Sequence, residues 1–229
     1  MDGAAELAAG EVLAVGGGRG EDSGSIDAFA LSRTKATRPQ VCFLPTASGD
    51  ADREIDEFYA AYDSHASTVH ISLFRRSRRD LADTLGAADL IVIGGGNTAN
   101  LLALWRLHGV DALVSGAYRR GAILLGFSAG ASALFERSMS DSFGGLSALD
   151  DGLGVIPGLF CAHYASPKRP PACRALSGAR WDTGYAADDG AALHFAEGVL
   201  RGSFPWHPGA NGYRLLQGEA EVVPSLRNV

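Results

Sequence analysis

The segment Gly126-Phe127-Ser128-Ala129-Gly130 holds a serine between two glycines. It follows the apolar run 122–125 and precedes residues 131–136, which favour a helix. Glycines at a strand-to-helix turn remove Cβ clashes, so the serine can adopt a strained conformation and a substrate can approach the main chain. The N-terminus of the helix would stabilise negative charge beside Ser128. The pattern predicts a nucleophile elbow, and the alternative is a turn of small residues without a chemical role.

A serine hydroxyl is a weak nucleophile near neutral pH, so this chemistry requires a histidine base and usually a carboxylate that orients it. His163 ends a short apolar run and enters a polar loop, which suits a side chain presented at a sheet edge. A lone histidine is more often structural, however, and the other five occupy expected helix ends, strands or loops. These alternatives are His65, His70, His108, His194 and His207.

Two glycine-rich segments follow apolar runs. Gly94-Gly95-Gly96-Asn97-Thr98 opens an expected helix, at the strand ends where α/β folds bind ligands, and its N–H groups could meet an oxyanion. A dinucleotide or phosphate loop is the alternative, but the G-x-G-x-x-G spacing and the Walker lysine are missing. The segment 16–20 also lacks that fingerprint, because Glu21 stands where the third glycine belongs. We expect a tight turn there.

The order of apolar and amphipathic segments predicts the fold. Short unbroken apolar runs are typical of strands buried on both faces, and helical patterns separate them. The sequence therefore predicts an α/β fold with a doubly wound, mostly parallel sheet in one domain, 1–229. The expected strands are 13–15, 41–44, 69–73, 90–93 and 123–125, and the expected helices are 26–33, 52–62 and 98–107.

The pattern changes after about residue 140, where glycine, proline and short β-like pieces dominate. We expect added C-terminal strands, antiparallel and packed beside the core. The proline-rich stretch 167–171 predicts a loop. The expected added strands are 191–195, 198–200, 213–216 and 220–223.

Composition excludes several classes of protein. The chain has 229 residues, 46% hydrophobic and 20% charged, and no apolar run approaches the roughly 18 residues of a membrane span. Twenty basic residues against 26 acidic ones give a net charge of −6, so attraction to nucleic acid or anionic lipid is not expected. The basic run 75–79 lacks interleaved aromatic residues and predicts a solvated loop or helix start.

The three cysteines, Cys42, Cys161 and Cys173, form no C-x-x-C pair. This argues against a disulfide framework and a structural zinc site, and we expect a reducing cytoplasm and no metal or organic cofactor. Residues 1–10 carry no basic segment typical of a secretory signal, and we expect a frayed lead-in to the first strand.

Four segments together resemble the peptidase E group of serine peptidases, in order and approximate spacing from residue 12 to about 216. This group includes aspartyl dipeptidases and cyanophycinases, and its sheet core is similar to class I glutamine amidotransferases. The resemblance implies Ser128 as nucleophile and His163 as base, with the N–H groups of Gly96 and Ala129 as oxyanion hole and Asn97 and Thr98 near the substrate. The segments are Gly94-Gly95-Gly96-Asn97-Thr98, Gly126-Phe127-Ser128-Ala129-Gly130-Ala131, Asp141-Ser142-Phe143-Gly144 and Cys161-Ala162-His163-Tyr164.

The third catalytic member has two candidates. Asp141 matches the aspartate described as a triad member in peptidase E, whereas Asp189 occupies the place where cyanophycinase-like relatives carry a glutamate. Both also fit structural roles, Asp141 as a turn cap and Asp189 in a hairpin. We favour Asp189 as the acid that orients His163, with Asp141 acting on a neighbouring loop.

One departure from the family pattern concerns the substrate. Members often have Pro-His-Tyr-Asp where this chain has Ala162-His163-Tyr164-Ala165, so an acidic loop residue is missing. Recognition of an N-terminal aspartate would require a cation, best an arginine that binds the carboxylate through two hydrogen bonds. Arg169 and Arg174 are the candidates, and a solvated surface position is the alternative for each.

The sequence thus predicts a serine hydrolase that cleaves small peptides, such as dipeptides with an N-terminal aspartate, through an acyl-enzyme. The alternatives are another specificity in the same group, such as a carboxypeptidase or a β-aspartyl or cyanophycin-type hydrolase, and a non-catalytic binding protein, which Ala162 and Ala165 favour. A glutaminase-like amidotransferase would need a thiolate in place of Ser128. The expected partner is a small peptide, with no nucleic acid and no membrane, and a homodimer is left open.

Overall fold

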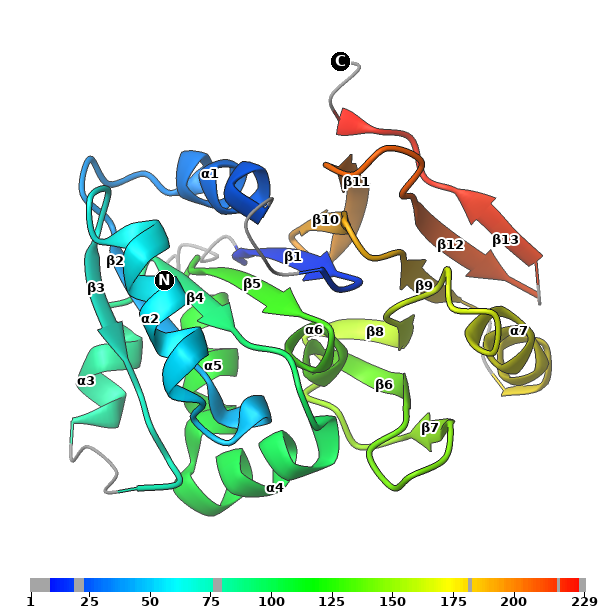
Figure 1. Cartoon of the computed structure of the whole chain (residues 1–229), viewed down its shortest axis with the longest axis horizontal. Helices are drawn as coiled ribbons and strands as arrows, with labels where there is room; N and C mark the ends of the chain where they lie inside the picture. Colours follow the sequence, from blue (N-terminus) through cyan, green and yellow to red (C-terminus); the bar gives the residue numbers. More distant parts are fainter. Residues whose placement is uncertain (1–8, 19–22, 76–79, 181–182, 218, 227–229) are drawn as a thin grey trace, which may run out of the picture.

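The computed structural model describes residues 9–18, 23–75, 80–180, 183–217 and 219–226, with only the backbone for 177–180. Two β-sheets lie next to each other, the larger one flanked by most of the helices (Figure 1). The larger sheet has seven strands in the order β11-β10-β1-β5-β4-β2-β3, and the smaller has six in the order β13-β12-β9-β8-β6-β7.

In the larger sheet, five neighbouring strands are parallel: β1, β5, β4, β2 and β3. Strands β10 and β11 extend the sheet beside β1 in antiparallel pairing. The carboxyl ends of the parallel strands therefore meet at one edge, where the glycine-rich segments lie. The strands are β1 Glu11–Val15, β2 Gln40–Leu44, β3 Ser67–His70, β4 Leu90–Ile93, β5 Ile123–Phe127, β10 Ala191–Ala196 and β11 Val199–Pro205.

Both faces of this sheet are buried. Along β1, Val12 and Ala14 belong to a core cluster with Trp105 of α4, whereas Leu13 and Val15 belong to a second cluster with helices α1 and α2. Alternate residues of one strand therefore pack into different cores, which is why the strands are unbroken apolar runs. The helices are α1 Gly24–Arg33, α2 Asp52–Tyr62, α3 Leu81–Gly86, α4 Thr98–His108 and α5 Val110–Arg119, and a 3-10 turn spans Thr46–Ser48.

The smaller sheet begins directly after the central strand of the larger one. Helix α6 leads from β5 into β6, and all six of its residues are buried. Sequence reasoning predicted neither β6 to β9 nor α7. These elements are α6 Ala129–Leu134, β6 Phe135–Ser140, β7 Ser147–Leu149, β8 Ile156–Cys161, α7 Arg169–Arg180, β9 Gly184–Ala187, β12 Gly212–Leu216 and β13 Glu219–Val222.

Two local predictions were wrong in part. The helix expected over 131–136 ends at Leu134, because Phe135 pairs with Ile156 in the second sheet. The stretch expected as a loop enters α7 at Arg169. Pro170 and Pro171 fit this first turn, where a backbone N–H has no helical acceptor and proline loses nothing. Arg76–Arg79, most of the basic run, lie outside the described residues.

Four aromatic rings join the two sheets. Phe135 of β6 stacks on Phe160 of β8 with ring centroids 4.7 Å apart, and meets Phe195 of β10 edge-on at 5.7 Å. Tyr185 of β9 contacts Phe195 at 5.0 Å. Because Phe195 belongs to the larger sheet and the other three to the smaller one, this cluster fixes how the sheets sit against each other.

Within the described ranges, no helix is both long and apolar enough to span a membrane. The same residues include no cluster of three or more His, Cys, Asp or Glu side chains suited to a metal ion.

We predict that Phe135→Ala lowers the free energy of unfolding by about 3–5 kcal/mol, because it leaves a cavity between the sheets. Urea denaturation followed by circular dichroism measures this change. Phe143→Ala is the matched control, since Phe143 is 77% exposed and its removal should change stability by no more than about 0.5 kcal/mol. Equal destabilisation by the two variants would contradict a joining role for the cluster.

Candidate active site

Ser128 lies in a sharp turn between β5 and α6, with φ 50° and ψ −104°. This positive φ is strained for a residue with a side chain. The turn persists because the Ser128 N–H donates to the Val15 carbonyl at 3.0 Å and the Ser128 carbonyl accepts from the Ser132 N–H at 2.8 Å. The strain thus falls on the one residue of the turn that carries a hydroxyl.

The glycines on either side of Ser128 let strand and helix approach each other. A Cβ at Gly126 would lie 2.6 Å from the Ala131 nitrogen, and one at Gly130 would lie 2.4 Å from the Ile93 carbonyl oxygen. Real Cβ atoms do not tolerate such contacts, so any side chain would push α6 away from the sheet and change the direction of Ser128. The glycine-serine-glycine spacing therefore has a packing cause.

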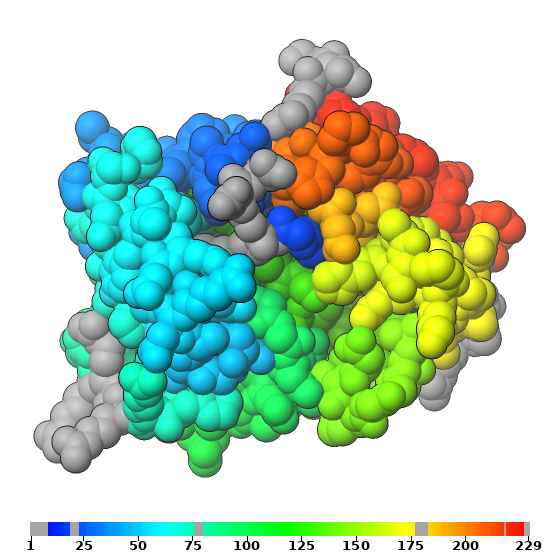
Figure 2. Space-filling view, in the orientation of Figure 1, coloured from blue at the N-terminus to red at the C-terminus, as the bar shows by residue number. Residues whose placement is uncertain are grey.

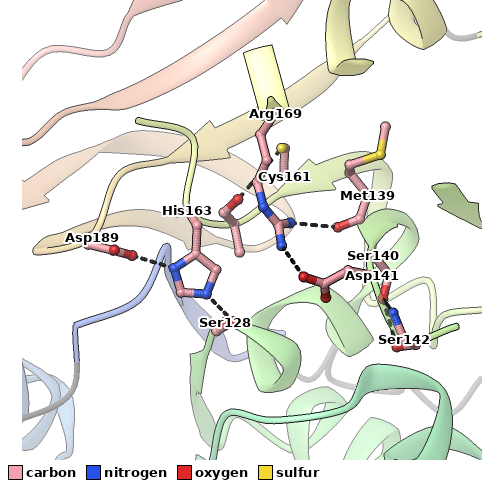
Figure 3. Close-up of polar contacts among 10 residues, drawn as sticks. Ser128, Met139, Ser140, Asp141, Ser142, Cys161, His163, Arg169 and Asp189 are labelled. Carbon is pink, nitrogen blue, oxygen red and sulfur yellow. Dashed lines mark hydrogen bonds and ion pairs between the residues drawn. The ribbon is translucent and has the colours of Figure 1, made fainter. Parts of the chain in front are cut away.

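His163 follows β8 in the second sheet and lies against the serine turn. Its Nε2 is 2.6 Å from Ser128 Oγ (Figure 3). The backbone at His163 also has a positive φ of 51°, and its N–H donates to the Gly16 carbonyl at 3.0 Å. The loop after β1, which belongs to the larger sheet, thus holds the backbone of the histidine in place.

Asp189 completes a chain of hydrogen bonds. It lies between β9 and β10, and its Oδ1 is 2.5 Å from His163 Nδ1 (Figure 3). With the proton on Nδ1 donated to this carboxylate, Nε2 is left to accept from the serine hydroxyl. The side chains are 35% exposed for His163 and 57% for Asp189, so solvent reaches the site.

Gly17 is a functional position that the sequence prediction of a tight turn missed. A Cβ there would lie 2.2 Å from Asp189 Oδ1 and 2.3 Å from His163 Cε1. The backbone of Gly17 also pairs with Asp189, and its carbonyl accepts from the Gly190 N–H at 3.1 Å. The histidine and aspartate therefore rest against bare backbone. A run of glycines directly after a buried strand was the available signal.

The glycine loop after β4 borders Ser128 on the other side. A Cβ at Gly95 would lie 3.7 Å from the Ser128 Cβ, and one at Gly96 would lie 2.1 Å from the Ala47 carbonyl oxygen. The Ala129 N–H belongs to the first turn of α6, where helical N–H groups have no acceptor within the helix. The Gly95 backbone and the first turn of α6 thus border the serine, and the oxyanion hole expected at Gly96 and Ala129 stays a prediction.

Asn97 and Thr98 lie at the start of α4. Asn97 caps α4 by accepting from the Asn100 N–H at 2.9 Å, and its amide donates to the Ser142 carbonyl at 3.0 Å. Thr98 is only 4% exposed in this arrangement, and its expected contact with the substrate stays a prediction. Both residues shape the loop that follows Gly96.

The structure separates the two candidate aspartates. Asp141 lies away from the imidazole and pairs with Arg169, with Oδ2 3.1 Å from Nη2, whereas Asp189 contacts His163 (Figure 3). Arg169 also donates to the Met139 carbonyl at 3.2 Å. Arg174 is exposed on α7, and its charge acts on the phenol of Tyr164. Of the two candidate arginines, Arg169 is the one beside Asp141.

Tyr164, directly after His163, stays neutral near neutral pH. Burial raises the pKa of its phenol to about 12, although the Arg174 charge opposes the rise. The phenol is therefore no competitor for the role of a proton acceptor, and His163 is the group placed to take the serine proton.

Comparison with known proteins identifies the relatives of this chain. The family model described as Peptidase family S51 matches residues 12–201. A Bacillus subtilis (strain 168) protein named "Uncharacterized peptidase YgaJ" is 40% identical over 219 residues, which cover 93% of this chain and 95% of that protein.

Two solved structures share the fold. A peptidase from an acI-B1 Actinobacterium has a TM-score of 0.63 and 16% identity, covering 95% of this chain and 98% of its own. A "Putative Peptidase E Protein" from Listeria monocytogenes EGD-e has a TM-score of 0.64 and 17% identity, covering 86% of this chain and 99% of its own.

We predict that Gly17→Ala slows the reaction of Ser128 with a fluorophosphonate by about a hundredfold or more, because the new methyl group displaces the imidazole or the carboxylate. Labelling rates followed by mass spectrometry measure the effect. Gly145→Ala is the control, since its Cβ would meet no atom within 4 Å. An unchanged rate in a folded Gly17→Ala protein would contradict the role given to this backbone.

Proposed function

The chain belongs to peptidase family S51, which confirms the resemblance to peptidase E, and we propose that it hydrolyses small peptides with Ser128 as the nucleophile. One observation carries this proposal: the unbroken hydrogen-bond chain from Ser128 through His163 to Asp189, at 2.6 and 2.5 Å. These distances lie within the range needed for proton transfer and for orienting a base.

In the acylation step, Ser128 Oγ attacks the peptide carbonyl carbon while His163 Nε2 takes the hydroxyl proton. The carbonyl oxygen becomes negative, and the N–H groups of Gly96 and Ala129 stabilise it. The tetrahedral adduct then breaks its C–N bond, and the leaving amine takes the proton from His163. The product of this step is an ester between the acyl group and Ser128.

Deacylation reverses the roles with water in place of the amine. His163 takes a proton from water, the resulting hydroxide attacks the ester carbon, and Ser128 Oγ leaves with the proton. Asp189 holds the imidazole in one orientation through both steps and stabilises the imidazolium that forms.

We further propose that the substrates are dipeptides with an N-terminal aspartate. Arg169 supports this specificity, because backbone hydrogen bonds through Ser166 connect it to His163 and its side chain is only 11% exposed. A partly buried arginine discriminates strongly between a carboxylate and a neutral side chain. Carboxypeptidase or β-aspartyl specificity is the alternative within the same family.

We place this activity in a reducing compartment, the cytoplasm. The three cysteines Cys42, Cys161 and Cys173 support this proposal, since all three are buried free thiols. An oxidising compartment would expose such thiols to disulfide exchange during folding.

We predict that a fluorophosphonate labels the protein at Ser128 and that Ser128→Ala abolishes labelling. Asp189→Asn should lower kcat by about 10³–10⁴-fold, because the imidazole then adopts the wrong tautomer. Asp151→Asn, which removes an exposed carboxylate paired with Arg106, is the control and should keep its activity. A folded protein that resists the label would instead be a non-catalytic binding protein.

We predict that Asp-Leu is cleaved at least about tenfold faster, in kcat/KM, than Leu-Asp or N-acetyl-Asp-Leu, because a misplaced or missing charge costs about 1.4 kcal/mol or more at a buried ion pair. Chromatographic detection of free leucine and aspartate measures the products. Preferred release of the C-terminal residue from blocked peptides would contradict this specificity and indicate a carboxypeptidase.

A further inference from the structure

The site lies between two walls that come from different sheets. The first wall is the segment that follows His163. The His163 carbonyl accepts from the Ser166 N–H at 2.9 Å, and the Ser166 carbonyl accepts from the Arg169 N–H at 2.9 Å. Two successive tight turns therefore keep the Arg169 backbone close to the histidine.

The second wall is the glycine loop with the segment docked on it. Ser142 accepts from the Ala99 N–H through its hydroxyl at 3.2 Å, and its carbonyl accepts from the Asn97 side chain at 3.0 Å. Asn97 directly follows Gly96, whose loop borders Ser128. Asp141, next to Ser142, therefore belongs to the segment docked on this glycine loop.

The ion pair between Asp141 and Arg169 joins these two walls (Figure 3). In the space-filling view, the green segments of the serine side and the yellow segments around α7 meet on one face of the molecule (Figure 2).

Asp141 and Arg169 differ in solvent exposure and in their other contacts. The Asp141 side chain is 70% exposed and keeps most of its hydration, whereas that of Arg169 is 11% exposed. Their contact is a single one, Nη2 to Oδ2 at 3.1 Å, and Nη1 is held separately by the Met139 carbonyl. Arg169 thus stays in place when Asp141 leaves, and its remaining N–H donors can receive another carboxylate.

We propose that Asp141 is an internal competitor for Arg169: in the free protein it occupies the guanidinium, and a carboxylate of the bound peptide takes its place. This inference rests on the proposed peptidase function and adds a specificity-determining residue to it. Exposed ion pairs are weak, so the exchange costs the substrate only about two- to fivefold in affinity. The charge-assisted hydrogen bonds between the substrate carboxylate and Arg169 increase the affinity by more than this roughly two- to fivefold cost.

The ligand carboxylate has two possible sources in a dipeptide, the side chain of the first residue and the C-terminus. Three substrates separate them: Asp-Leu has both carboxylates, Asn-Leu has only the C-terminal one, and Asp-Leu-amide has only the side-chain one. The loop keeps its Ser142 contacts after the exchange, so no large movement of the backbone is required.

The test compares KM values for D141N, R169M and the unaltered protein. D141N should lower KM about two- to fivefold for the substrates whose carboxylate reaches Arg169, because the competitor is lost. R169M should raise KM about tenfold or more for the same substrates. A change confined to Asp-Leu and Asp-Leu-amide identifies the side chain, and one confined to Asp-Leu and Asn-Leu identifies the C-terminus.

D151N is the matched control, because it removes one carboxylate from another exposed aspartate–arginine pair, Asp151 with Arg106. It reports the effect of net charge alone and should leave all three KM values unchanged. The proposal would be overturned if D141N changed KM equally for all three substrates, or changed KM for none of them. A roughly hundredfold loss of kcat in D141N would also overturn it, because that loss is expected of an acid that orients His163.

Binding to Ser128→Ala variants by calorimetry separates this inference from the proposed function. In that background no hydrolysis occurs, and D141N should still tighten the binding of Asp-Leu by the same factor. Binding that follows this pattern in a protein without hydrolytic activity would reject the peptidase proposal and keep the exchange. Hydrolysis without any effect of D141N or R169M on binding would reject the exchange alone.

Discussion

The hydrogen bond between Ser128 and His163 is the contact on which the arrangement depends, because its two partners come from different sheets. Ser128 ends the central strand of the larger sheet, and His163 follows a strand of the smaller one. The 2.6 Å contact therefore depends on how the two sheets are placed against each other. The contacts of Phe135 and Tyr185 with Phe195, which belongs to the larger sheet, and the buried helix α6 hold the two sheets together. Packing far from the surface therefore sets the geometry of the chemistry.

A second constraint is the lack of side-chain volume around this contact. Gly16 and Gly17 let the first strand's loop lie against the chain at 187–189, and Gly126 and Gly130 let α6 approach the sheet. On the far side of Asp189, a Cβ at Gly190 would lie 2.3 Å from the ring of His207. Each glycine is needed for a close approach rather than for flexibility. Within this close-packed arrangement, Ser128 and His163 both have a positive φ, 50° and 51°, which is strained for residues with a side chain.

Side chains of the same residue type have different roles. Asp189 faces an imidazole, while Asp141 faces a guanidinium on the opposite wall. At the other edge of the larger sheet, His194 Nε2 lies 2.7 Å from Glu11, which also binds Arg33. This buried histidine belongs to β10, as its place in the expected strand 191–195 predicted. The two histidines thus differ in their spatial neighbours: His194 contacts Glu11, whereas His163 contacts Ser128 and Asp189.

The sequence by itself determined the local features. These are the buried parallel strands, whose unbroken apolar runs reflect burial on both faces, and the serine turn. Four motifs, in the order and approximate spacing of peptidase E, also indicated the family. The sequence left open which aspartate meets His163, because 48 positions separate Asp141 from Asp189 and no periodic pattern relates them. It also missed β6 to β9, where short strands of the second sheet alternate weakly between buried and exposed residues. Only the tertiary structure decided these points. The registry of two sheets, fixed by long-range aromatic packing and close glycine contacts, places Asp189 against the imidazole and Asp141 against Arg169.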